Sequence, residues 1–424
     1  MPLAPLRLSL STLVLTASLA APACPAQEPA PRFATDRAGA LELPLPDEQA
    51  AFQFVVFGDR TGGPPEGVAV LEQAVRDANL LAPDFVMTVG DLVEGYNERE
   101  AWLRQAAEFR GIMSGLRCPW FPVAGNHDIY WRGKAHRLEE EHEGDYETTF
   151  GPLWYAFRHK DSWFVVLYSD EGDPKTGKRD FRDPKAQRMS DEQLAWLEST
   201  LARARDARHV FVFLHHPRWH GGGYGDDWDR VHAVLRDAGN VSAVFAGHIH
   251  HMQYDGVRDG IEYFTIASVG AWLEPGLEPV GHLHELHLVT VRGDSVDVAA
   301  FPVGAAIDPR SLTAEVTLAG LQARDRVLPR FAGRVRLRAD GSLRTVVTLE
   351  LANPTLFPLD IDLTLDGGDP AWTVPPAPRS SRLAPGERCS VALPLARDAF
   401  PPDGRLRFPE LVARVRLVLS TGEL

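Results

Sequence analysis

Cysteine is scarce in this chain, which has 3 in 424 residues, namely Cys24, Cys118 and Cys389. A small domain stapled by disulfides needs more, and a thiolate metal site needs about four ligands at close spacing. Cys118 and Cys389 also fall in different predicted domains, so we expect two separate buried thiols. The scarcity excludes a disulfide framework and a thiolate metal site.

An excess of basic charge is also missing, because the formal net charge is −14. A general nucleic-acid binder needs a basic face to meet the phosphate backbone, so we expect no general nucleic-acid binding. From Asp308 onward the chain has 16 Arg, 14 acidic residues and no Lys. The acidity therefore lies in the earlier part of the chain, where it suits the binding of cations.

No apolar run is long enough to span a bilayer comfortably, so we expect no transmembrane segment. The run Leu8–Ala20 follows Arg7 and precedes the small residues Ala21-Pro22-Ala23. This pattern is typical of an export signal over residues 1–23, with a membrane anchor as the alternative. We expect an exported protein, periplasmic or secreted, and Cys24 leaves a lipoprotein open. Residues 24–49 are rich in Pro and Ala, which predicts a linker.

Strand and helix patterns alternate over residues 50–304, which predicts an α/β layered domain. The first three buried strands are expected at Phe52–Phe57, Phe85–Val89 and Trp120–Ala124, with helices between them. Further strands are expected at 154–157, 163–167, 210–214, 241–246, 263–266, 284–291 and 296–301, with helices at 190–205 and 231–238. In open α/β sheets, functional sites form beyond the carboxyl ends of the strands.

The pattern changes from about Ala305, where no helical period is found. Apolar and polar residues instead alternate over Val335–Arg338, Leu359–Leu365 and Val412–Leu419, with turn signals such as Asp340-Gly341 between them. Alternation of this kind predicts an all-β sandwich, an accessory domain over residues 305–424.

Five predicted strands of the first domain end in residues that can bind metal or carry protons. They are Asp59, Asp91, Asn126-His127-Asp128, His215, and His248 with His250. Carboxylates, an amide oxygen and imidazoles form a mixed set that suits Mn, Fe or Zn better than Ca or Mg. About seven ligands exceed one tetrahedral site, so we expect two divalent or trivalent ions that share a carboxylate. Two ions about 3.5–4 Å apart are suited to hydrolysing phosphate esters.

The order of these motifs resembles that of the calcineurin-like metallophosphoesterases, including the purple acid phosphatase branch. It consists of Gly58-Asp59, Gly90-Asp91, Gly125-Asn126-His127-Asp128, His215 and Gly247-His248-Ile249-His250. The resemblance covers about residues 52–301. It implies an α/β core of two stacked β-sheets flanked by helices, ahead of the all-β sandwich.

The resemblance also implies a role for each residue of the motifs. Asp91 would bridge the two metals, while Asp59 and His250 would bind one of them. The other metal would be bound by Asn126, His215 and His248. His127 would bind the phosphate or protonate the leaving oxygen, and Asp128 would orient its ring.

The chain departs from the family pattern at the first metal. The family places His two residues after the first Asp, where this chain has Thr61. The purple acid phosphatase branch places Tyr three residues after the second Asp, where this chain has Glu94, with Tyr96 nearby. We expect Glu94 or a water to complete this site. Arg60 is expected to face the substrate phosphate, and pairing with a surface acid is the alternative.

Three functions remain open from the sequence. The first is a metallophosphoesterase that hydrolyses phosphate monoesters or diesters with a metal-bound hydroxide. The second is a binding or scaffold protein on the same fold, weakened in catalysis by Thr61, with the β-sandwich as the functional module. In the third, the β-sandwich binds a cell-surface polymer and the phosphoesterase trims it. His216 and His251 adjoin predicted ligands and are expected to point away or lie at the rim. The polar stretch Gly172–Arg188 is a candidate lid.

Overall fold

The computed structural model describes residues 50–61, 66–130, 141–173, 183, 188–275, 277–307, 310, 313–366, 370–399, 408–419 and 422–423. The predicted export signal, the linker with Cys24 and most of the candidate lid lie outside these residues. In the described part of the chain, no helix is both long and apolar enough to cross a membrane.

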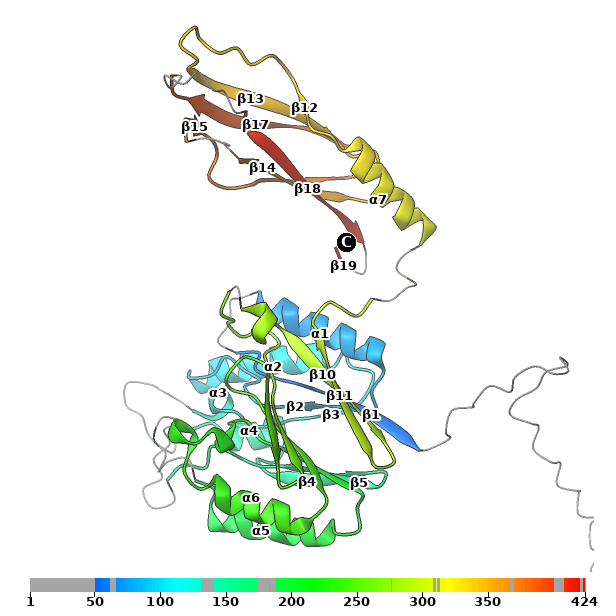
Figure 1. The fold of residues 1–424 in the computed structure, drawn as a ribbon. Helices are drawn as coiled ribbons and strands as arrows, with labels where there is room; N and C mark the ends of the chain where they lie inside the picture. The colour runs from blue at the N-terminus through cyan, green and yellow to red at the C-terminus, as the bar shows by residue number, and fades with distance from the viewer. Residues whose placement is uncertain are drawn as a thin grey trace, which may run out of the picture. The chain divides into compact units, whose positions relative to one another are not determined.

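One sheet of the core has five strands in the order β11-β10-β1-β2-β3. These strands are β1 (Ala51–Phe57), β2 (Phe85–Thr88), β3 (Trp120–Phe121), β10 (Glu285–Arg292) and β11 (Ser295–Pro302). β1, β2 and β3 run parallel, and β10 pairs antiparallel with β1. Helices α1 (Gly67–Leu81) and α2 (Arg99–Met113) cover the outer face, where Leu71 and Trp102 pack against Val55 and Phe57. The outer face of this sheet is therefore closed by helices (Figure 1).

The second sheet of the core has six strands in the order β4-β5-β6-β7-β9-β8. These are β4 (Tyr155–His159), β5 (Ser162–Val166), β6 (His209–Phe213), β7 (Val241–Ala246), β8 (Gln253–Arg258) and β9 (Ile261–Thr265). Helices α5 (Asp191–Arg203) and α6 (Trp228–Ala238) pack on its outer face. Short helices α3 (Asn126–Ile129) and α4 (Glu143–Thr149) and the 3-10 turns η3 (Arg218–His220), η4 (Gly222–Tyr224) and η5 (Glu278–Val280) complete the core.

The two sheets face each other across an aromatic core. On β1, Phe54 and Val56 point into this core, whereas Val55 and Phe57 point to the helices, as the twofold period of a strand requires. Phe54 packs edge-on against Phe211, with ring centroids 5.2 Å apart. This arrangement confirms the predicted core of two sheets flanked by helices.

The C-terminal region consists mainly of two further sheets. One sheet contains, in order, β12 (Arg330–Phe331), β13 (Leu343–Ala352), β17 (Arg388–Arg397) and β15 (Trp372–Thr373). The other contains, in order, β16 (Arg379–Leu383), β14 (Leu359–Asp366), β18 (Glu410–Leu419) and β19 (Gly422–Glu423). Leu349 and Leu393 of one sheet share a core with Ile361 and Leu417 of the other. The predicted all-β region is thereby confirmed. Described strands up to β11 pair only with one another, as do those from β12 onward, so we propose a domain boundary near residue 304.

Two expectations for this region are wrong. A helix, α7 (Ala314–Arg326), precedes the strands, and Val335–Arg338 is not a strand. The buried face of α7 uses Val316, Ala319 and Ala323, whose small side chains give a weak periodic signal. The alternation over Val335–Arg338 has no buried face, because this segment is largely exposed.

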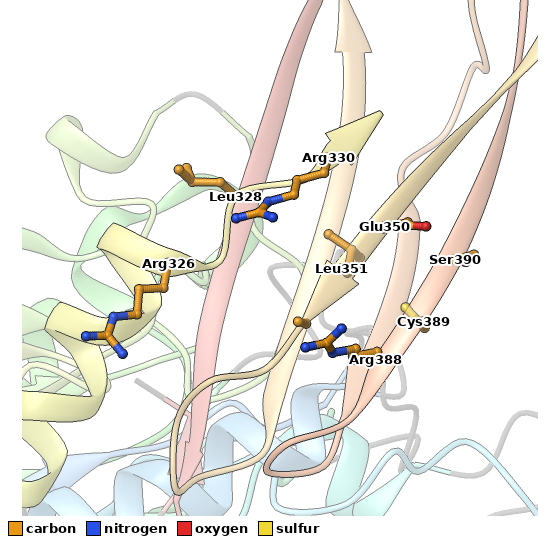
Figure 2. A pocket seen from close by; sticks show the side chains of 9 residues that line it. Arg326, Leu328, Arg330, Glu350, Leu351, Arg388, Cys389 and Ser390 are labelled. Atoms are coloured by element: carbon orange, nitrogen blue, oxygen red, sulfur yellow. The ribbon is translucent and has the colours of Figure 1, made fainter. Parts of the chain in front are cut away.

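The described residues of the C-terminal sheets line cavities of different character. One, of about 760 Å³, is lined by apolar side chains such as Val347, Leu365 and Trp372. Another, of about 350 Å³, is surrounded by Arg326 of α7, Arg330 of β12 and Arg388 of β17, as Figure 2 shows. Glu350 also lines this cavity, so the charged side chains of its lining are basic on balance.

Candidate metal centre

Hydrogen bonds join the strand ends at which the predicted site residues lie. The turn after β1 is bonded to the turn after β2, where Asp59 N donates to Gly90 O at 3.0 Å. In the other sheet, Gly247 N donates to His215 O at 2.9 Å. Hydrogen bonds between backbone atoms thus hold the carboxyl ends of neighbouring parallel strands together in pairs.

Four predicted ligands have a backbone conformation that residues other than glycine rarely adopt. The φ angle is +54° at Asp59 and Asp91, +75° at His248 and +56° at His250. Each such conformation costs of order 1–3 kcal/mol and persists where the surrounding structure enforces it. Their concentration at one edge of the core is typical of a functional site.

Atoms able to bind metal converge into two groups within 4.8 Å, one of Asp59, Asp91 and His250 and the other of His215, His216 and His248. Asp91 joins the groups, since its Oδ2 lies 3.3 Å from His215 Nε2. Asn126 Oδ1 lies 3.1 Å from the same Nε2. The structure thus brings together all six residues predicted as ligands, namely Asp59, Asp91, Asn126, His215, His248 and His250.

The hydrogen bonding of these residues fits a cation. His215 Nδ1 donates to Val89 O at 2.7 Å, which leaves Nε2 to face the oxygens of Asp91 and Asn126. Asp59 Oδ1 accepts from His248 N at 2.9 Å, but Asp59 Oδ2 is buried without a hydrogen-bond partner among the described residues. Acceptor atoms that face one another away from water need a proton or a metal ion between them.

The electrostatics of the buried carboxylates lead to the same conclusion. Burial raises the pKa of Asp59 well above its ordinary value. Burial acts the same way on Asp91, but the imidazoles of His215 and His127 outweigh it and lower the pKa of Asp91. In turn, burial lowers the pKa of His215, yet the carboxylates of Asp91, Asp59 and Asp170 together outweigh it and raise this pKa to about 10. Positive charge is therefore strongly stabilised at this position.

Two glycines of the motifs are required by close packing against the carboxylates. A Cβ at Gly125 would lie 2.3 Å from Asp91 Oδ1, and one at Gly247 would lie 2.1 Å from Asp59 Oδ2. No side chain fits at either distance. The glycines ahead of these two motifs therefore make room for a carboxylate oxygen.

His127 lies beside the cluster, but Asp128 does not orient its ring as expected. His127 N donates to Asp91 Oδ1 at 2.9 Å, and its Nδ1 contacts Glu94 O at 2.7 Å. Asp128 is fully buried, and its oxygens accept from the backbone N–H groups of Leu92, Val93 and Gly125. The carboxylate of Asp128 therefore holds the backbone of the turn, and the expected contact with the ring is wrong.

Comparison with known proteins decides the family of the core. Residues 52–252 match the family model described as calcineurin-like phosphoesterase. The chain carries a calcineurin-like phosphoesterase domain. Tartrate-resistant acid phosphatase type 5 of Homo sapiens is 25% identical over 249 residues, which cover 53% of this chain and 74% of that protein. This calcineurin-like domain makes the chain a phosphoric ester hydrolase, and the resemblance seen in the motifs is confirmed.

Solved structures resemble the phosphoesterase domain at lower identity. A dimetal phosphatase from Danio rerio is 17% identical, with a TM-score of 0.46, and covers 60% of this chain and 99% of its own. A purple acid phosphatase from yellow lupin seeds is 16% identical, with a TM-score of 0.44, and covers 62% of this chain and 54% of its own.

Arg60 and Glu94 of the phosphoesterase domain contact each other. The guanidinium of Arg60 lies 3.0 Å from Glu94 Oε2 and 3.2 Å from Glu108 Oε2. The alternative set out for Arg60, pairing with a surface acid, is the arrangement found. The carboxylate of Glu94 is 44% exposed and lies on Arg60, so the structure does not place it as a ligand of the first metal.

Tyr96 contacts Asn126 and His127 of the phosphoesterase site, a role that was not predicted for it from the sequence. Its hydroxyl accepts a hydrogen bond from Asn126 Nδ2, and its ring centroid lies 4.2 Å from that of His127. An amide with its nitrogen held in this way keeps its oxygen toward His215. The signal was present in the sequence, since Tyr96 stands two residues beyond the position where the purple acid phosphatase branch has Tyr.

His216 does not point away from the phosphoesterase site as expected. It is buried, and its ring centroid lies 4.1 Å from that of His248. Its Nδ1 lies 3.1 Å from Asp170 Oδ2, and Tyr130 donates to the other oxygen of Asp170 at 2.7 Å. A histidine held by a carboxylate at one nitrogen is a common arrangement beside metals.

Proposed function

We propose that this phosphoesterase domain hydrolyses phosphate monoesters or diesters with the help of two metal ions. One observation carries the proposal. Six residues from five strand ends converge on two adjoining groups of atoms able to bind metal, with Asn126 beside His215, and an oxygen of Asp59 there has no hydrogen-bond partner among the described residues. The mixed oxygen and nitrogen donors favour Mn, Fe or Zn.

The six converging residues would hold the ions, with Asp91 placed between the two groups. Bound ions would polarise the phosphoryl oxygens and acidify a water. His127 is half-buried, and the carbonyl of Glu94 holds its Nδ1. Its Nε2 is therefore the ring atom free to bind the phosphate or to protonate the leaving oxygen.

Activity assays on aryl phosphates test this function. The purified chain is expected to hydrolyse 4-nitrophenyl phosphate or bis(4-nitrophenyl) phosphate after loading with Mn, Fe or Zn, and to lose the activity in a chelator. The preferred ester distinguishes a monoesterase from a diesterase. A folded protein that hydrolyses neither ester with any of these metals would contradict the proposal and favour a binding or scaffold role.

A second role, binding of an anionic cell-surface polymer by the C-terminal region, is favoured by the cavity in Figure 2. Its three arginines, Arg326, Arg330 and Arg388, offer planar donors that suit phosphate or carboxylate groups. Retention of the full chain on an immobilised anionic polymer is expected to weaken in Arg330→Ala/Arg388→Ala, with phosphatase activity unchanged. Equal retention of this variant and the wild type would contradict the role.

Export is proposed from the sequence pattern of residues 1–23. Cell fractionation and the mass of the mature chain test it. A chain that begins after Ala23 in the periplasm or medium is expected, and a lipid-modified Cys24 would specify a lipoprotein. A full-length chain that starts at Met1 and stays in the cytoplasm would contradict export.

A further inference from the structure

The position at which the family has a metal-binding histidine holds a hydroxyl that contacts His127. Thr61 is completely buried, and its Oγ1 lies 2.9 Å from His127 Nδ1. The same hydroxyl donates to Glu94 O at 3.2 Å, and Glu94 O lies 2.7 Å from His127 Nδ1. Three atoms thus form a compact triangle on one edge of the imidazole.

The hydrogens of this triangle can be assigned from its chemistry. A carbonyl oxygen only accepts, so both the hydroxyl of Thr61 and Nδ1 of His127 donate to Glu94 O. A lone pair of Thr61 Oγ1 remains directed at the hydrogen on Nδ1. His127 Nδ1 therefore carries a hydrogen, and proton exchange is confined to Nε2.

The segment that carries the Glu94 carbonyl is fastened from several sides. The carboxylate of Glu94 is bound to Arg60, and Gly95 N donates to Gln105 Oε1 at 3.1 Å. Gly95 has φ +66°, and a Cβ there would lie 1.8 Å from His127 O. Gly95, which follows the Glu94 carbonyl, is thus packed directly against the backbone of His127.

Tyr96 limits the remaining freedom of the imidazole. Its ring lies 4.2 Å from the ring of His127, centroid to centroid. The ring of Tyr96 packs against the imidazole, and Thr61 Oγ1 and Glu94 O contact its Nδ1. These contacts together restrict rotation about the side-chain bonds of His127. A fixed ring keeps its Nε2 in one direction, which proton transfer requires.

We propose that Thr61 is a positioning residue that, together with the carbonyl of Glu94, fixes the ring and the tautomer of His127. The turn after β1 thereby supplies Asp59 to the metal cluster and a hydroxyl to the proton-transfer residue. This inference rests on the proposed function in one respect, since it assigns His127 a role in turnover. The placement of the ring can be tested without activity.

Thr61→Val removes the hydroxyl and keeps the volume, while Thr61→Ser restores it. With phenyl phosphate, a poor leaving group, kcat of Thr61→Val is expected to fall about three- to tenfold, as the loss of one hydrogen bond allows. With 4-nitrophenyl phosphate the fall should be smaller, because that leaving group needs less protonation. KM and metal content should not change, and Thr61→Ser should recover the wild-type rate.

A double-mutant cycle shows whether Thr61 acts through His127. In a His127→Ala background, Thr61→Val is expected to have no further effect on kcat. An equal loss of rate in both backgrounds, or an equal loss with both esters, would overturn the proposal. Loss of metal from Thr61→Val would also overturn it, because Thr61 would then act on the cluster.

Histidine ¹H–¹⁵N spectra of the zinc-loaded protein give a readout that needs no turnover. The Nδ1–H signal of His127, identified by its absence in His127→Gln, is expected in the wild type and Thr61→Ser and should broaden in Thr61→Val. An unchanged signal in Thr61→Val would contradict the proposal. A protein with this Thr61-dependent signal but no phosphatase activity would support the placement of His127 and contradict the proposed function.

Discussion

His215 and Asp91 face each other at 3.3 Å between Nε2 and Oδ2, with both side chains buried. They come from different sheets of the core, His215 after β6 and Asp91 after β2. Their contact joins the two groups of metal-binding atoms. The carboxylate of Asp91, predicted from the sequence to be shared by two metal ions, thus lies between the two groups of metal-binding atoms.

Asp91→Asn should therefore weaken both metal positions. An amide cannot balance the charge of two ions, so we expect phosphatase activity to fall at least about 100-fold, beyond the typical effect of an outer-shell partner. Rates with 4-nitrophenyl phosphate under saturating metal measure this change. Activity within about twofold of the wild type would show that Asp91 does not hold the metals.

Gly247→Ala tests the close packing around Asp59. Its Cβ would lie 2.1 Å from Asp59 Oδ2, so the carboxylate must move and the protein should bind less metal. Gly111→Ala is a matched control, because Gly111 lies in α2 with nothing within 4 Å of the added Cβ. The control should keep its metal and gain about 0.5–1 kcal/mol in the free energy of unfolding. Equal metal content in the two variants would contradict the packing argument.

Asp170→Asn tests the part played by His216. Burial alone would raise the pKa of Asp170, but His216 and Arg218 hold it at about 2, so this carboxylate is charged. Its replacement should lower metal affinity or activity about 10- to 100-fold. Asp259→Asn removes a similar partner from His232, on α6, and serves as the control. If both variants bind metal with the same affinity, His216 has no part in metal binding.

The pH dependence of stability tests a buried pair on β10 that the site does not use. Burial raises the pKa of Glu285 to about 8 and lowers that of His287 to about 4. Their nearest oxygen and nitrogen lie 3.3 Å apart. A carboxyl with a raised pKa stabilises the folded state at low pH, and the contribution is lost as pH rises toward 8.

The contribution of His287 has the opposite sign and is complete above about pH 6.5. Within this pair only Glu285 changes its protonation between pH 6.5 and 8, so its contribution should lower the free energy of unfolding by up to about 1.4 kcal/mol per pH unit. Urea unfolding should show this decline in the wild type and a flatter profile in Glu285→Gln. Parallel profiles for the two proteins would contradict the raised pKa of Glu285.

The sequence allowed the strand ends to be predicted because their signals are local. A buried apolar run followed by Gly and a polar residue predicts both the strand and the side chain at its carboxyl end, as at Gly90-Asp91. Parallel pairing then brings such ends together without knowledge of the side-chain conformations. The convergence of the strand-end residues could be predicted on this basis, whereas the choice of six of them as metal ligands came from the resemblance to the family.

Contacts between distant turns could not be predicted in this way. Arg60 contacts Glu94 and Glu108, which lie 34 and 48 residues further along the chain. The sequence around Arg60 does not indicate whether its partner is one of these acids or a substrate phosphate. His216 follows the end of a strand, where the alternation of side chains no longer sets its direction. The apolar face of α7 depends on alanines, whose burial leaves little trace in the sequence.

Elemental analysis of the purified, folded chain tests the central claim most directly. We expect about two ions of Mn, Fe or Zn per chain after loading, as a shared-carboxylate centre requires. Asp91→Asn should retain at most one. A folded wild-type chain that binds no ion, or only one, after loading with any of these metals would contradict the two-metal centre at these strand ends.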